Sequence, residues 1–233
     1  MLGSVRVMMI DDSAGDVFLI HEILLNSLDA HFEMESHPTL TDGLKRLSEE
    51  RFDIVLLDLT LPDSRGIDTF QKLSGMFPVL PIIVMSGVDD HDAVQTIIGS
   101  GAQDYLVKGE ISSKLLKRSI LNALARKRLE DESKLFQKAI DSMQLSIVIT
   151  DGKGGILYSN PSTTQILGFS QSELMGQNFG QLTGDAHRFL KDKYFDTSIL
   201  RKDGSRANVR ILADPIPFSS GPSRLVFAIL ELK

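Results

Sequence analysis

The sequence contains no cysteine in its 233 residues. This absence excludes disulfide bonds, metal sites built on thiolates and catalysis by a cysteine nucleophile. A chain of this length that folds without disulfides is typical of a reducing compartment.

Long apolar runs are absent as well. The opening segment, MLGSVRVMMIDD, has too short an apolar run for a signal peptide or a membrane span, and no later stretch approaches about 20 uninterrupted apolar residues. We therefore expect a cytoplasmic protein that does not engage a membrane. The net charge of -6 is unfavourable for general binding to phosphate backbones, and no helix-turn-helix segment is evident, so we expect no nucleic-acid partner.

The composition is that of an ordinary globular protein. Apolar residues make up 42% of the chain and charged residues 24%, and the length suits two domains. We expect a first domain over residues 1–129, a connecting helix over 112–143 and a second domain over 136–233.

Up to about Leu129, short apolar runs alternate with segments of helical periodicity. Several runs are almost continuous Val, Ile, Leu and Met, which is typical of strands buried on both faces of a parallel sheet. The alternation predicts an α/β fold, a doubly wound five-stranded parallel sheet with helices on both faces. Ser13 and Thr41 are expected to cap the first two helices. The expected strands are Val5–Ile10, Phe32–Glu35, Ile54–Leu59, Pro81–Met85 and Tyr105–Val107.

The segment from Ser112 to Thr150 contains no glycine or proline. It carries a broken apolar stripe on either side of the mixed-charge stretch RKRLEDESK, Arg126–Lys134. A single helix that runs from one domain into the next explains this pattern better than a flexible linker. Two helices with a hinge near Asp131 are the alternative.

The chain after Ser142 changes character. Turn clusters such as DGKGG and KDGS separate short apolar segments, which predicts a hairpin, short helices and then an antiparallel meander. This is an α+β domain with an antiparallel sheet. The expected strands are Ile147–Thr150, Ile156–Ser159, Thr197–Arg201, Ala207–Ala213 and Leu225–Leu230, and the expected helices are Ser162–Leu167, Ser170–Met175 and Asp185–Lys193.

Polar residues stand at the ends of four predicted parallel strands, where ligands bind in α/β sheets. They are Asp11 with Asp12, then Asp58, Ser86 and Lys108. Clustered carboxylates repel, so we expect a hard divalent cation such as Mg2+, with the lysine neutralising one further charge. Such a set suits phosphoryl transfer to a carboxylate nucleophile. Taken singly, each residue has a structural alternative, as a helix cap, a turn residue or a solvated lysine.

At these residues the first half resembles the response-regulator receiver family. The matching pieces, in order, are MMIDDS, LLDLTLPDSRG, IIVMSG and DYLVKG, and the resemblance covers roughly residues 4–128. It implies a flavodoxin-like fold in which Asp58 is the phosphoacceptor. It also implies that Asp11 and Asp12 hold Mg2+, with Asp12 as the direct ligand, and that Asp58 and the backbone carbonyl of Thr60 complete the protein ligands.

By the same resemblance, Lys108 binds the phosphoryl group, and Ser86 and Tyr105 occupy the two switch positions. Taken alone, Tyr105 suits ordinary core packing equally well. The sequence departs from the family at Gly109, where a proline in a cis peptide usually follows the lysine. Since a non-proline cis bond costs about 2.5–4 kcal/mol, the coupling through this loop can differ from that of typical members.

The second half resembles a PAS domain. The matching features are the segment from Ala139 to Gly176 and, further along the chain, the RKDGS turn. Asn160 is expected to cap a helix, which is a structural role. Without cysteine, flavin–cysteinyl photochemistry is excluded, and His187 is the one candidate haem ligand. We expect no cofactor in this domain and Mg2+ as the cofactor of the first.

These features predict a response regulator of a two-component phosphorelay. A sensor histidine kinase or a phosphotransfer protein is the expected partner, and the change at Asp58 would pass through the helix to the PAS domain. Beyond slow self-catalysed phosphorylation and dephosphorylation we expect no enzymatic activity. The alternative is the N-terminal regulatory part of a larger signalling enzyme, either a hybrid histidine kinase or a cyclic-dinucleotide enzyme.

A homodimer is also expected. A helix that projects beyond its domain cannot bury its apolar stripe on that domain alone. Leu124, Leu135 and Met143 would then pair with a second, parallel copy. The competing hypothesis is that the stripe folds back onto the PAS sheet of its own chain.

Overall fold

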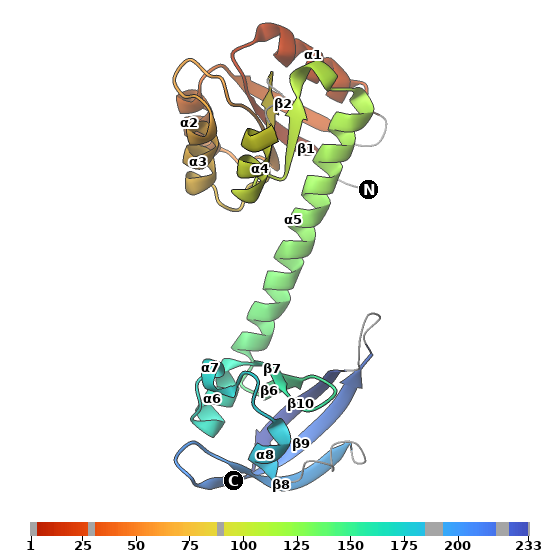
Figure 1. The fold of residues 1–233 in the computed structure, drawn as a ribbon. Helices are drawn as coiled ribbons and strands as arrows, with labels where there is room; N and C mark the ends of the chain where they lie inside the picture. The colour runs from red at the N-terminus through yellow and green to blue at the C-terminus, as the bar shows by residue number, and fades with distance from the viewer. Residues whose placement is uncertain (1–3, 28–30, 88–90, 185–192, 218–223, 233) are drawn as a thin grey trace. The chain divides into compact units, whose positions relative to one another are not determined.

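The computed structural model describes residues 4–27, 31–87, 91–184, 193–217 and 224–232. The chain divides into two compact units, Met1–Asp131 and Glu132–Lys233. Figure 1 shows each unit as a sheet covered by helices. No helix within the described ranges combines the length and the hydropathy that crossing a membrane requires.

The first unit is built on a five-stranded sheet in the order β2-β1-β3-β4-β5. All neighbouring strands pair in parallel, as predicted. The strands are β1 (Val5–Ile10), β2 (Phe32–His37), β3 (Ile54–Asp58), β4 (Ile82–Ser86) and β5 (Asp104–Val107).

Helices cover both faces of this sheet. Because side chains alternate along a strand, Ile54 and Leu56 enter one apolar cluster, whereas Val55 and Leu57 enter the other. The doubly wound α/β prediction is therefore confirmed. The helices are α1 (Ala14–Leu25), α2 (Leu40–Glu49), α3 (Ile67–Met76), α4 (His91–Gly99), the short 3-10 helix η1 (Lys108–Glu110) and α5 (Ser113–Ser142).

The predicted N-terminal cap is confirmed for α1 and wrong for α2. Ser13 caps α1, with its hydroxyl accepting a hydrogen bond from the backbone N–H of Asp16. The prediction for α2 was wrong, because Thr39 is the cap and its hydroxyl accepts from Asp42. Thr41 lies in the first turn and bonds a carboxylate from another loop, which no local pattern could indicate.

Helix α5 is continuous over 30 residues, so the alternative with a hinge near Asp131 is wrong. Its first turns bury Leu116 and Ile120 in the core of the first unit, and Leu124 packs partly against the same cluster. Leu124 is thus partly covered by its own domain, and its expected pairing with a second copy of the chain stays a prediction. Further along, the apolar side chains are exposed.

The second unit is built on an antiparallel sheet in the order β7-β6-β10-β9-β8. Short helices pack on its inner face, where the rings of Phe179 and Phe227 lie 4.4 Å apart. The predicted α+β arrangement is confirmed, although helix α8 was not anticipated, and most of the helix expected over Asp185–Lys193 lies outside the described residues. The elements are β6 (Ser146–Thr150), β7 (Ile156–Ser159), α6 (Pro161–Leu167), α7 (Gln171–Leu174), α8 (Phe179–Thr183), β8 (Tyr194–Leu200), β9 (Arg206–Ile216) and β10 (Arg224–Glu231).

Asn160 joins the end of α5 to the start of the second sheet. Its side-chain oxygen caps α6 by accepting from Thr163 and also accepts from the N–H of Ile147. Its amide nitrogen donates to the carbonyls of Ile140 and Leu145. The predicted capping role is confirmed, and the buried amide satisfies backbone groups from three separate elements.

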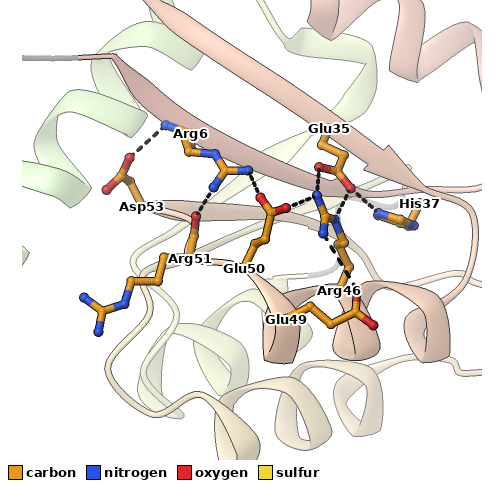
Figure 2. Close-up of polar contacts among 8 residues, drawn as sticks. All are labelled: Arg6, Glu35, His37, Arg46, Glu49, Glu50, Arg51 and Asp53. Atoms are coloured by element: carbon orange, nitrogen blue, oxygen red, sulfur yellow. Dashed lines mark hydrogen bonds and ion pairs between the residues drawn. The ribbon is translucent and has the colours of Figure 1, made fainter.

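An ion-pair network holds α2 against the edge of the first sheet (Figure 2). Arg46 Nε lies 2.7 Å from Glu35 Oε1 on β2, and Arg46 Nη2 lies 2.7 Å from Glu50 Oε1. Glu50 also pairs with Arg6 of β1, whose guanidinium lies 4.6 Å from the centre of the Phe52 ring. The C-terminal end of α2 is thereby fixed to two neighbouring strands.

The Arg46–Glu35 pair should make stability depend on pH. Hydrogen bonds from Arg46 lower the pKa of Glu35 from 4.5 to about 2. A depressed folded-state pKa stabilises the fold above the unfolded value, and this contribution is lost as the pH falls through the folded value. We expect Glu35→Gln to be less stable than the parent above about pH 4.5, with the difference vanishing towards pH 2.

Urea unfolding of both proteins between pH 7 and pH 2 checks this expectation. Glu33→Gln, at an exposed position of the same strand, is the matched control. A difference between parent and Glu35→Gln that stays constant over the whole range would contradict the assignment of the pair.

Candidate functional site

Three aspartates meet at the carboxyl edge of the first sheet. Ile10 pairs with Leu57 across β1 and β3, so the next residues, Asp11 and Asp58, emerge side by side. Carboxylate oxygens of Asp11, Asp12 and Asp58 all lie within 4.8 Å of one another. Asp11 and Asp58 are buried, whereas Asp12 is exposed. The parallel sheet thus brings together residues that are far apart in the sequence, as expected.

Lys108 reaches into this cluster from η1, directly after β5. Its Nζ lies 2.7 Å from Asp58 Oδ2, 2.8 Å from Asp11 Oδ2 and 2.9 Å from Asp16 Oδ2. Asp16 was not among the predicted site residues. The sequence did contain an indication of this role, because the first turn of the helix that follows β1 lies at the same edge of the sheet.

The charges at this edge shift one another's pKa values. Burial lowers the pKa of Lys108, but its contacts with Asp11, Asp58 and Asp16 outweigh this and raise it overall. Lys108 also lowers the pKa of Asp16. Burial raises the pKa of Asp11 in spite of the nearby ammonium. One lysine therefore faces more carboxylates than it can neutralise.

The donor set fits a hard cation such as Mg2+. The three clustered aspartates offer only oxygen ligands, which Mg2+ prefers. Asp11 Oδ2 is buried and makes a charge contact with Lys108, yet no well-aligned hydrogen bond reaches it within the described residues. A cation would compensate this oxygen. Asp11, Asp12 and Asp58 are the side chains that would hold it.

Thr60 lies two residues beyond the phosphoacceptor candidate. Its backbone N–H donates to Asp58 Oδ1 at 3.1 Å, so the peptide that precedes Thr60 is oriented by the carboxylate itself. The two oxygens of Asp58 thus have different partners, Thr60 on Oδ1 and Lys108 on Oδ2. Binding of a cation by the Thr60 carbonyl stays a prediction.

The two expected switch residues lie on neighbouring strands. Ser86 ends β4 and pairs with Val107, the residue before Lys108. It is 6% exposed, close behind the edge that carries Asp58. Tyr105 on β5 is half-buried and packs against the apolar cluster under α2, α3 and α4. The peptide between Lys108 and Gly109 is trans.

The second unit is expected to hold no cofactor. His187, the candidate haem ligand, lies outside the described residues. Two hydroxyl oxygens, those of Thr150 on β6 and Ser159 on β7, are buried without a hydrogen-bond partner among the described residues. They are the polar atoms of this core that a water molecule or a small ligand could satisfy.

Comparison with known proteins assigns both units. Residues 7–120 match the family described as the response regulator receiver domain, and residues 134–222 match the PAS fold. The chain belongs to the response regulator receiver family, with a PAS domain after its receiver domain.

The chain is similar to several characterised receivers. It is 30% identical over 104 residues to the chemotaxis protein CheY of Thermotoga maritima, covering 44% of this chain and 84% of that protein. It is 30% identical over 103 residues to the DNA-binding transcriptional regulator NtrC of Proteus hauseri, covering 43% of this chain and 22% of that protein. The crystal structure of a response regulator receiver domain protein from Clostridium thermocellum is 27% identical, with a TM-score of 0.48 over 54% of this chain and 98% of that one. The aligned part spans between 20% and 28% of the first curated relatives, so it matches only a fraction of their length.

Removing Asp12 should weaken Mg2+ binding without unfolding the protein, because Asp12 is exposed and the core does not depend on it. Loss of an indirect supporting group typically costs a metal site 10–100-fold in affinity, so loss of a direct ligand should cost at least about tenfold. Calorimetric titration of Asp12→Ala with Mg2+ measures the change. Asp68→Ala, at an exposed position of α3, is the control. Equal affinity of Asp12→Ala and the parent would contradict the site.

Proposed function

We propose that this chain is a response regulator that accepts a phosphoryl group on Asp58 from a phosphohistidine. The donor would be a sensor histidine kinase or a phosphotransfer protein, and the change would pass along α5 to the PAS domain. The observation that carries this proposal is the contact of Lys108 with Asp58 inside a cluster of carboxylates at the edge of the sheet. A positive charge beside a carboxylate nucleophile is what transfer of a charged phosphoryl group requires.

The transfer itself uses the two oxygens of Asp58. One of them attacks the phosphorus, the P–N bond to the donor histidine breaks, and its electron pair returns to the imidazole. Lys108, already 2.7 Å from Oδ2, lies where it can follow the charge onto the phosphoryl oxygens. The N–H of Thr60 holds the other carboxylate oxygen in place. Mg2+, when bound, would neutralise further charge on the same oxygens.

The same site would hydrolyse its acyl phosphate slowly, with water as the attacking group. This is the only enzymatic activity that we propose for the chain. The output would then depend on how long Asp58 stays phosphorylated, since phosphorylation and the separate hydrolysis step both act at the same few groups.

Phosphorylation of Asp58 can be tested with a small phosphodonor such as acetyl phosphate. We expect the intact mass of the parent to increase by one phosphoryl group when Mg2+ is present and to stay unchanged in EDTA. Asp58→Asn removes the nucleophilic oxygen while nearly conserving the shape, so it should not be labelled. Equal labelling of Asp58→Asn and the parent would contradict the assignment of Asp58 as the phosphoacceptor.

A second candidate function is the regulatory part of a larger signalling enzyme, either a hybrid histidine kinase or a cyclic-dinucleotide enzyme. The observation that favours it is that a longer relative is itself an enzyme: the protein-glutamate methylesterase/protein-glutamine glutaminase of a Nocardioides species is matched over only 29% of its length. The sequence of the native gene beyond Lys233 separates this candidate from a free-standing relay.

We further propose that the chain forms a parallel homodimer through the exposed part of α5. Leu129 and Phe136 of α5 are both 67% exposed, and Met143, which directly follows the helix, is 45% exposed. A seven-residue apolar spacing supplies one of the two apolar positions of a coiled-coil heptad, and we propose that a second copy of the same helix covers this row, which is then the seam of the dimer. Leu135, which is 65% exposed, borders this seam.

A negative charge introduced at the seam should separate the two copies of the chain in the proposed dimer. We expect the parent to scatter light as a dimer at micromolar concentration and Phe136→Asp and Leu135→Asp to shift it toward monomer. Both side chains are mostly exposed, so neither change should unfold the chain. Lys134→Asp, at an exposed position away from the seam, is the matched control. A parent that scatters light as a monomer, both without and with the phosphoryl mimic beryllofluoride, would contradict the proposed dimer.

A further inference from the structure

Asp63 links the loop after β3 to the N-terminus of α2. Its Oδ1 accepts a hydrogen bond from the backbone N–H of Leu40 at 2.9 Å. Its Oδ2 accepts from the N–H of Thr41 at 2.8 Å and from the hydroxyl of Thr41 at 2.7 Å. Two N–H groups that a helix start leaves unpaired are thus satisfied by a carboxylate from another element.

The loop that Asp63 belongs to, residues 59–66, carries Thr60 and closes on itself. The N–H of Leu61 donates to the carbonyl of Ser64 at 3.0 Å, and the N–H of Gly66 donates to the carbonyl of Leu59 at 2.8 Å. Leu61 is 1% exposed. Gly66 has a φ of 66°, a conformation that residues with a side chain rarely adopt. Internal hydrogen bonds and the buried Leu61 therefore tie the residues of this loop to one another.

The helix that Asp63 holds is itself firmly placed. The network of Figure 2 fixes the C-terminal end of α2 to β1 and β2. Nearer its start, Gly43 packs so closely on β1 that an added Cβ would lie 2.4 Å from Ile10 Cδ1. Ile10 directly precedes Asp11. Through α2, the loop is thus tied to the strand that carries the other two aspartates of the cluster.

We propose that Asp63 is a positioning residue for the phosphorylation site. By holding the loop against α2, it sets the place of Thr60, whose backbone N–H bonds Asp58 and whose backbone carbonyl is the expected ligand of Mg2+. This inference rests on the proposed phosphorylation of Asp58 and adds a residue that touches neither the phosphoryl group nor the metal.

The charge of Asp63 supports this role. Burial raises the pKa of its carboxyl, but the hydroxyl of Thr41 and the backbone N–H groups of Thr41 and Leu40 lower it overall. The side chain is therefore ionised at neutral pH, where a carboxylate at a helix N-terminus is favourable.

The test compares Mg2+ binding by the full chain with and without this link. Asp63→Ala should bind Mg2+ about tenfold more weakly in a calorimetric titration, as expected when a group that orients a metal ligand is lost. In phosphorylation by acetyl phosphate, the Mg2+ concentration for half-maximal rate should rise by a similar factor. The maximal rate at saturating Mg2+ should change much less, because Asp58 and Lys108 are untouched.

A second variant separates positioning from simple loss of helix stability. Thr39→Ala removes the cap of α2, in which the Thr39 hydroxyl accepts from Asp42 N at 3.1 Å, and leaves Asp63 in place. It should lower the thermal stability much as Asp63→Ala does and leave the Mg2+ affinity at the parent value. Thr41→Val, which loses only the hydroxyl bond to Asp63, should weaken Mg2+ binding in the same direction as Asp63→Ala and by less.

The outcomes are distinct. Two results would overturn the positioning role alone, provided that the parent is still phosphorylated on Asp58. One is that Asp63→Ala binds Mg2+ as tightly as the parent does. The other is that Thr39→Ala loses as much Mg2+ affinity as Asp63→Ala. A parent that neither binds Mg2+ nor accepts the phosphoryl group would overturn the proposed function, and the role of Asp63 with it.

Discussion

The carboxylates at the edge of the receiver sheet repel one another, and the ammonium of Lys108 is what allows them to stay together. A pair of like charges at about 4 Å costs about 4 kcal/mol at an effective dielectric of 20. Lys108 contacts Asp11, Asp16 and Asp58 at once and is largely removed from water. Its charge still leaves the cluster negative. The edge is therefore held together and remains able to attract a cation and the phosphoryl oxygens of a donor.

The scaffold around this edge gives its side chains little freedom. Strands β1, β3 and β4 are buried on both faces, so their ends cannot shift without disturbing two apolar clusters. Gly43 allows α2 to lie directly on Ile10, and ion pairs hold the far end of that helix. The loop after Asp58 is fastened to the start of the same helix by Asp63. The position of Asp58 thus depends on packing that begins well outside the carboxylate cluster.

Helix α5 has two environments along its length. Its first turns are part of the receiver core, through Leu116 and Ile120, and its last turn is bonded to the PAS unit through Asn160. Asp141 in that turn also accepts a hydrogen bond from the Tyr158 hydroxyl of β7. Between these ends, Leu129 and Phe136 face solvent. The same helix thus supplies part of the core of the first unit and a backbone acceptor to the second.

The sequence by itself determined the order of the strands and helices of the first unit and the three aspartates of the carboxylate cluster. Apolar runs mark strands that are buried on both faces, and residues at their ends must meet at one edge, which is why Asp11, Asp58 and Lys108 could be grouped without coordinates. Only the tertiary structure decided which side chains pair across elements. Asp16 turns to Lys108, and Thr41 bonds Asp63 while Thr39 caps α2. These choices depend on distances between segments that are remote in sequence, and local periodicity carries no information about such distances.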